Sequence, residues 1–125
     1  MIQSTFVYNI LDLLLDGDED GFSARSQLQH LTDVETHYDA EGVVVYFDFD
    51  GPLPEPDDEE DLVLSGVFIV SEQDQIEAEA VLYFADGIVD CLEIVCLSGD
   101  YPPRELTQYT LTQDWGLGRT LSVMG

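Results

Sequence analysis

The sequence predicts an α+β fold in which two N-terminal helices pack on a mostly antiparallel sheet of about six strands. Three observations lead to this fold class. Apolar residues recur at helical spacing only before residue 32, strand-length runs follow, and short turns join neighbouring runs. The 125 residues fit one domain over 1–125, which can bury a core without a metal ion or a disulfide.

The two predicted helices cover residues 4–15 and 23–31. Ser4 can accept a hydrogen bond from the first turn as an N-cap, and Gly17 suits the end of the same helix. Ser23 can cap the second helix in the same way. The apolar residues at helical spacing are Phe6, Ile10, Leu13 and Leu14 in the first helix, and Ala24, Leu28 and Leu31 in the second.

Apolar runs of strand length follow the helices. Residues 42–50 alternate between two faces, and the short connection 39–42 predicts a hairpin with the run before it. Asp86-Gly87 suits a type I′ turn and predicts a second hairpin. The expected strands are 33–38, 42–50, 62–70, 78–85, 88–97 and 106–112, and residues from 114 onward are expected to form a loop.

The two strands beside Asp86-Gly87 are apolar on both faces near the turn, as in Leu82-Tyr83-Phe84 and Ile88-Val89. Strands with this composition are usually buried on both sides. We therefore expect them at the centre of the sheet, covered on both sides or partly covered by another subunit.

Charge is the extreme feature of the composition. The chain has 27 acidic residues, 3 arginines and no lysine, which gives a formal net charge of -24. Such a surface repels nucleic acid and anionic membranes, and it attracts basic proteins. The same charge also fits a solubility role or adaptation to high salt, and composition does not separate these explanations.

Residues 51–61 are expected to form an exposed acidic loop. Three prolines and five consecutive acidic residues cannot pair in a sheet. The acidic run is the natural edge of a partner-binding face, and its residues are Asp57, Asp58, Glu59, Glu60 and Asp61.

The cysteines and the apolar runs indicate a cytoplasmic location. Cys91 and Cys96 lie too far apart along one strand for a disulfide and point to opposite faces, so we expect buried free thiols. The N-terminus lacks the basic region and cleavage site of a secretory signal. No apolar run has the roughly 18 residues that a membrane span needs.

One segment resembles the start of a calcium loop. Asp16, Asp18 and Asp20 occupy alternate positions and Gly21 follows at the sharp turn. The loop normally closes with a bidentate glutamate, and here that position holds Gln27. Weak calcium binding therefore stays an alternative, and we expect no cofactor.

No constellation predicts catalysis. The chain has no lysine, no phosphate loop and no serine in a nucleophile-elbow context, and His30 and His37 have no cysteine nearby to complete a zinc site. Glu93 interrupts an apolar strand, so its carboxylate needs a partner or access to solvent. With the Asp86-Gly87 turn setting the register, Glu93 would lie opposite Ala80. We expect a structural ion pair with Arg25, or alternatively with Arg104.

Short motifs late and early in the chain form a recognisable set. They are Arg25-x-Gln27-Leu28 in the second helix, Gly42 opening a strand with Tyr46-Phe47, and Asp86-Gly87 followed by Leu92-Glu93.

This set resembles that of a family of small uncharacterised bacterial proteins, over about residues 10–105. The family tends to have Leu where this chain has Ala24, and the acidic run 57–61 is peculiar to this chain. The late motif is also similar to that of immunity proteins of bacterial toxin systems. The family has no established activity, so the resemblance implies a common origin and structural roles for Arg25, Gln27 and Glu93.

The sequence therefore favours a non-enzymatic, acidic protein-binding module, immunity-like or antitoxin-like, that covers a basic partner protein such as a toxin nuclease. One alternative is a structural or housekeeping domain that forms a homodimer through its apolar hairpin, with charge serving only solubility. The other alternative is the weak calcium-binding protein described above.

Overall fold

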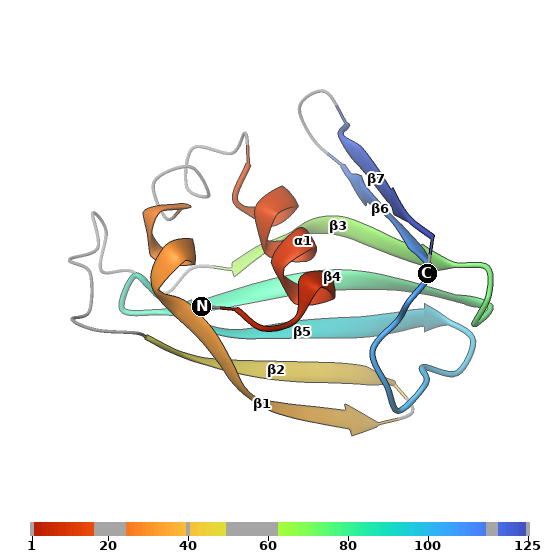
Figure 1. The fold of residues 1–125 in the computed structure, drawn as a ribbon, viewed down its shortest axis with the longest axis horizontal. Helices are drawn as coiled ribbons and strands as arrows, with labels where there is room; N and C mark the ends of the chain where they lie inside the picture. The colour runs from red at the N-terminus through yellow and green to blue at the C-terminus, as the bar shows by residue number, and fades with distance from the viewer. Residues whose placement is uncertain (1, 17–24, 40, 50–62, 115–117, 125) are drawn as a thin grey trace.

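The computed structural model describes residues 2–16, 25–39, 41–49, 63–114 and 118–124. Within these residues the chain forms one seven-stranded antiparallel sheet and two short helical segments (Figure 1). The strand order is β1-β2-β5-β4-β3-β6-β7. The strands are β1 (Leu31–Asp39), β2 (Gly42–Phe49), β3 (Val63–Ser71), β4 (Ile76–Ala85), β5 (Ile88–Ser98), β6 (Tyr109–Gln113) and β7 (Thr120–Val123).

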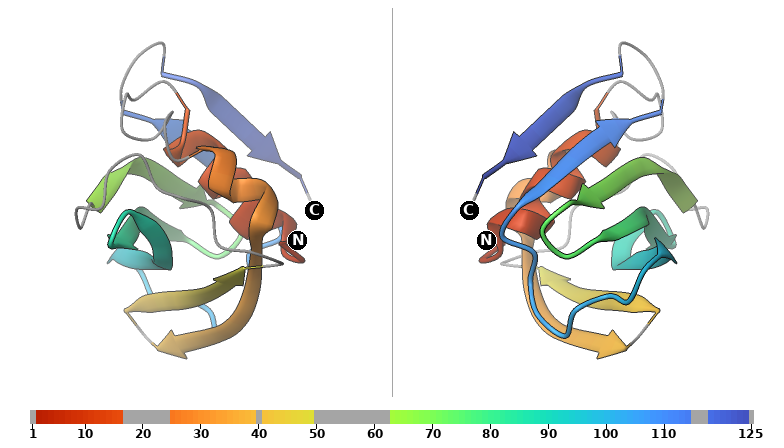
Figure 2. Two further views of the ribbon diagram at one scale, coloured as in Figure 1. Left: turned by 90° about the vertical axis from the view of Figure 1, so that its left-hand side faces the viewer. Right: turned by 90° about the vertical axis from the view of Figure 1, so that its right-hand side faces the viewer.

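The α-helix α1 (Thr5–Leu14) lies on one face of the sheet, and the sheet curves around it (Figure 2). Ser4 is its N-cap, as predicted, because the Ser4 hydroxyl accepts a hydrogen bond from the Val7 N–H at 3.1 Å. The helix ends at Leu14 with Leu15 as its C-cap, one residue before the predicted end, and Gly17 lies outside the described residues. Its buried side chains are Phe6, Val7, Ile10, Leu11, Leu13 and Leu14.

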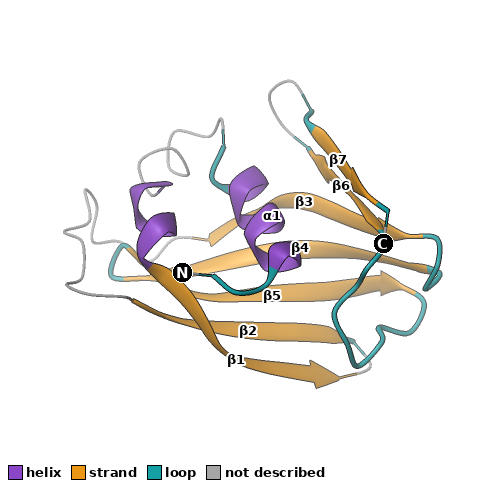
Figure 3. Ribbon diagram, in the orientation of Figure 1, coloured by secondary structure: helices purple, strands orange, loops and turns teal. Residues whose placement is uncertain are grey.

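The second predicted helix, 23–31, is wrong in type and in its end over the described residues, while Ser23 and Ala24 lie outside them. Residues Arg25–His30 form a 3-10 helix, η1, and Leu31 already begins β1 (Figure 3). The buried Gln27 side chain explains this geometry. Its Nε2 donates to the Gly87 carbonyl at 2.8 Å and its Oε1 accepts from the Val89 N–H at 2.9 Å. These bonds hold the segment against the β4–β5 hairpin, which supports the structural role expected for Gln27.

The expected loop after residue 114 contains a strand, so the described residues form seven strands and not about six. β7 pairs with β6 from Thr120–Thr112 to Val123–Tyr109. A short strand of this kind forms only where a partner strand offers its backbone groups, so the local glycines and polar residues did not reveal it.

Both predicted hairpins are confirmed. β1 and β2 pair up to Asp39–Gly42, and β4 and β5 pair up to Ala85–Ile88. Asp86 and Gly87 have φ values of 54° and 78°, the positive values that a type I′ turn requires.

The register beyond the second turn differs from the prediction by one residue. An irregularity after Phe84–Val89 leaves Asp90 unpaired, and Tyr83 then pairs with Cys91. Glu93 therefore lies opposite Val81, not Ala80. Since successive strand residues point to opposite faces, this single extra residue turns Glu93 away from the helix-covered side.

The sheet thus has two different faces. The covered face packs against α1 and forms the core with Val43, Val45, Val67, Ile69, Leu82, Leu92, Ile94 and Leu111. The opposite face, called the open face below, is covered by neither described helix (Figure 2). Within the described residues the central hairpin is therefore covered on one side, and partial cover of the other side by another subunit stays a prediction.

Candidate protein-binding face

Arg104 and Arg119, the two arginines whose side chains the structure describes, are both engaged away from the open face. Arg104 pairs with Asp74 in the turn between β3 and β4. Arg119 pairs with Asp16 after α1, and its Nη2 lies 3.6 Å from Asp12 Oδ2. Asp12, Asp16 and Asp74 therefore have cationic partners in the chain itself.

The open face carries carboxylates without an arginine among its described residues. Glu35 contacts His37, with Oε1 and Nε2 3.0 Å apart. Glu77, Glu79 and Asp90 form no ion pair within the described part of the chain. The carboxylates on this face come from β1, β2, β4 and β5, and they are Glu35, Asp39, Asp48, Glu77, Glu79, Asp90 and Glu93.

Apolar and aromatic side chains alternate with these carboxylates. One row crosses four strands, because Tyr46 pairs with Cys91, Cys91 with Tyr83, and Tyr83 with Val63. Tyr46 is 40% exposed and Val63 is 56% exposed. On the same face Val44, Val81, Val95 and Phe68 are half-buried, and Val70 is exposed.

Two tyrosines of this row contact polar neighbours. The Tyr83 hydroxyl donates to Glu93 Oε1 at 3.0 Å, and this bond is the main cause that raises the pKa of Tyr83. The His37 ring meets the Tyr46 ring edge-on, with centroids 5.7 Å apart and planes at 86°. Burial, followed by the charges of Asp90 and Glu93, raises the pKa of the Cys91 thiol, so that thiol stays protonated near neutral pH.

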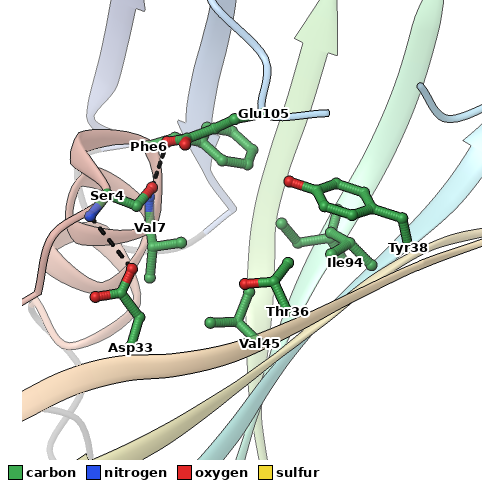
Figure 4. A pocket seen from close by; sticks show the side chains of 10 residues that line it. Ser4, Phe6, Val7, Asp33, Thr36, Tyr38, Val45, Ile94 and Glu105 are labelled. Atoms are coloured by element: carbon green, nitrogen blue, oxygen red, sulfur yellow. Dashed lines mark hydrogen bonds between the residues drawn. The ribbon is translucent and has the colours of Figure 1, made fainter. Parts of the chain in front are cut away.

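A small pocket of about 80 Å³ opens on the other side of the sheet, between the start of α1 and the strands β1 and β2 (Figure 4). Asp33 accepts hydrogen bonds from the backbone N–H groups of Gln3, at 2.7 Å, and Ser4, at 3.3 Å. The Ser4 hydroxyl donates to Glu105. Burial, and then the Glu105 charge, raises the pKa of Tyr38 at the pocket wall. Both carboxylates therefore serve to fix the N-terminus of α1.

Tyr101 is buried near this region, at 4% exposure, and its hydroxyl has no hydrogen-bond partner within the described residues. Burial, assisted by the nearby Tyr38 and Glu105, strongly raises its pKa. A tyrosine in this state is neutral at any physiological pH, and no described group accepts a hydrogen bond from its hydroxyl.

The structure describes only some of the predicted site residues. The run Asp57–Asp61 lies outside the described residues, and so do Asp18, Asp20 and the Arg25 side chain. Asp16 accepts hydrogen bonds from Arg119 and, at 3.4 Å, from Gln113 Nε2, so any calcium ion would compete with Arg119 for it. The ion pair between Arg25 and Glu93 stays a prediction, while the alternative partner Arg104 binds Asp74.

The cysteines are free, as expected, but both are only half-buried. Cys96 faces the covered side, where its thiol lies 3.3 Å from the carbonyl oxygens of Ser98 and Gly99, and Cys91 lies on the open face. Among the described residues no three His, Cys, Asp or Glu side chains gather where they could hold a metal ion. Neither described helix is long and apolar enough to cross a bilayer.

The carboxylates of the open face were not predicted as a group from the sequence. Glu77 and Glu79 alternate with Ile76, Ala78 and Ala80 at the start of β4, which is a usual signal of a strand with one solvated face. The predicted strand began at residue 78, so this alternation was cut short.

Comparison of the chain with protein-family models, curated proteins and solved structures gives no match in any of the three. The chemistry of the open face is therefore the feature that bears on function.

Proposed function

We propose that the chain is a non-enzymatic binding module whose open face docks on a basic protein, in the manner of an immunity protein or antitoxin that covers a cationic target. One observation carries this proposal. The open face combines apolar side chains with carboxylates that have no arginine partner among the described side chains, whereas Arg104 and Arg119 neutralise acids elsewhere.

The chemistry of the face supports a protein as the partner. Its half-buried apolar row provides apolar surface, and burying that surface against a partner stabilises the complex. Its carboxylates can pair with lysine or arginine side chains and can steer a cationic partner over long range. Nucleic acid lacks the cations that such a face requires.

The same charges oppose self-association through this face. Two copies meeting face to face would bring Glu77, Glu79 and Glu93 of one chain close to acidic residues of the other. Like charges at an interface cost several kcal/mol unless they are neutralised. A basic partner meets no such penalty, so it is a better occupant of this face than a second copy.

Binding to purified basic proteins, small nuclease domains among them, tests the proposal. We expect the affinity to fall steeply between low and high salt, because the Debye length shrinks from about 10 Å at 0.1 M to about 3 Å at 1 M. A nuclease that is bound should also lose activity when its cationic substrate-binding surface is covered.

Matched variants locate the binding face. The triple variant Glu77→Gln, Glu79→Gln, Glu93→Gln should weaken binding about tenfold or more, because it removes carboxylates at the centre of the face. The control triple Glu72→Gln, Asp100→Asn, Asp114→Asn removes the same charge from turns and loops and should have a much smaller effect. Equal losses for the two triples, or affinity that does not change with salt, would refute the open face as the docking site.

A further inference from the structure

We propose that the open face selects arginine over lysine on its partner, and that Tyr83 and Glu93 form the receiving site. This inference rests on the proposed function and adds the chemical identity of the side chain that the face recognises.

Tyr83 places an aromatic ring next to the Glu93 carboxylate. Tyr83 Oη donates to one oxygen of Glu93, and the other oxygen forms no hydrogen bond within the described residues. The cross-strand neighbours of Glu93 are Val44 and Val81, both half-buried. Because these neighbours partly shield the carboxylate from water, a cation that reaches it gains more than it would at a fully exposed acid.

His37 shows how a planar nitrogen group fits such a site. Its imidazole lies edge-on to Tyr46 and its Nε2 lies 3.0 Å from Glu35, the cross-strand partner of Tyr46. Tyr83 and Glu93 repeat the combination of a tyrosine ring and a carboxylate one strand pair away. Among the described side chains, no nitrogen-bearing group forms a hydrogen bond or ion pair with Tyr83 or Glu93. The Arg25 side chain, which the sequence predicts as the partner of Glu93, lies outside the described residues, and an arginine of the partner protein would replace it in this role.

Arginine fits this combination better than lysine does. The guanidinium group is planar, weakly hydrated and able to stack on a ring while it donates to a carboxylate. The lysine ammonium group is a compact, strongly hydrated charge, so it gains little from a tyrosine ring beside it. The remaining members of the row, Cys91 and Val63, offer apolar area for the methylene stem of an arginine.

Two synthetic peptides test the selection. They have equal length and charge, and one carries only arginine and the other only lysine as its cation. Titration calorimetry at one low salt concentration should give about threefold to thirtyfold tighter binding for the arginine peptide. Equal affinities would overturn the inference and leave the proposed function standing. Failure of both peptides to bind would overturn both.

Variants then assign the preference to the site. Tyr83→Leu and Glu93→Gln should each bring the ratio of the two affinities close to one. Glu77→Gln removes the same charge from the same face at a position whose strand neighbours, Val70 and Ser98, are not aromatic. It should weaken both peptides equally and preserve the ratio. An arginine preference that survives Tyr83→Leu would overturn the assignment, and circular dichroism checks that each variant is folded.

Discussion

The two faces of the central strands differ in how each side chain is satisfied. On the covered face, Leu82 and Leu92 are 0% exposed, and buried polar side chains such as Gln27 and Gln113 hold backbone groups. On the open face, half-buried apolar residues alternate with carboxylates, and the described arginines lie elsewhere. The same strands therefore stabilise the fold through one face, while the other face keeps carboxylates and apolar side chains that a partner could contact.

The largest expected effect contrasts two leucines of β5. Leu92 is 0% exposed and Leu97 is 55% exposed. Leu92→Ala should lower the free energy of unfolding by about 2–5 kcal/mol, because it removes buried methyl groups and leaves a cavity. Leu97→Ala should change it by about 0.5 kcal/mol or less. Urea unfolding measures both free energies. Similar losses for the two variants would mean that Leu97 is buried in solution.

The second prediction concerns the buried hydroxyl of Tyr101. Its buried hydroxyl has no described partner, so Tyr101→Phe should be neutral or stabilise the fold by up to about 1–3 kcal/mol at pH 7. Its pKa is raised in the folded state, so the wild type binds more protons folded than unfolded above pH 10 or so.

The wild type should therefore lose stability as pH rises above the ordinary tyrosine pKa of about 10, and Tyr101→Phe should lose less. Tyr8→Phe is the control, since Tyr8 is 46% exposed. Urea unfolding at neutral and alkaline pH makes the comparison. A clear loss of stability in Tyr101→Phe at pH 7 would show that the hydroxyl has a partner after all.

The smallest expected effect concerns repulsion on the open face. Glu77 and Glu79 point to the same side of β4, about 7 Å apart, and have no ion pair in the described chain. Glu77→Gln or Glu79→Gln should raise the free energy of unfolding by a few tenths of a kcal/mol at low salt, and the gain should vanish at high salt. Thermal unfolding at the two salt concentrations measures it. If either variant is less stable than the wild type, the replaced carboxylate has a stabilising partner within the chain.

Local signals predicted the elements that local chemistry controls. Ser4 caps α1 because its hydroxyl satisfies the first turn, and Asp86-Gly87 forms the turn because both residues tolerate positive φ. Elements that depend on distant partners were missed. β7 exists because β6 offers an edge, and η1 is fixed by hydrogen bonds from Gln27 to the β4–β5 hairpin.

The acidic binding face stays a prediction, and its predicted edge is not among the described residues of the open face. The charge indicated a basic partner, yet the predicted edge, Asp57–Asp61, lies outside the described residues. The open-face set depends on the unpaired Asp90, which shifts the register and brings Glu93 beside Tyr83. No local sequence signal marks this bulge, so only the pairing of the whole strands reveals it.

The amino-acid sequence alone determined the charge, the α+β class and the two hairpins, because composition and short-range backbone preferences act within a few residues. The tertiary structure decided which acids are neutralised and which face is left open. Those outcomes depend on contacts between residues far apart in the chain, such as Arg119 with Asp16 and Gln27 with Gly87, and no local pattern encodes them.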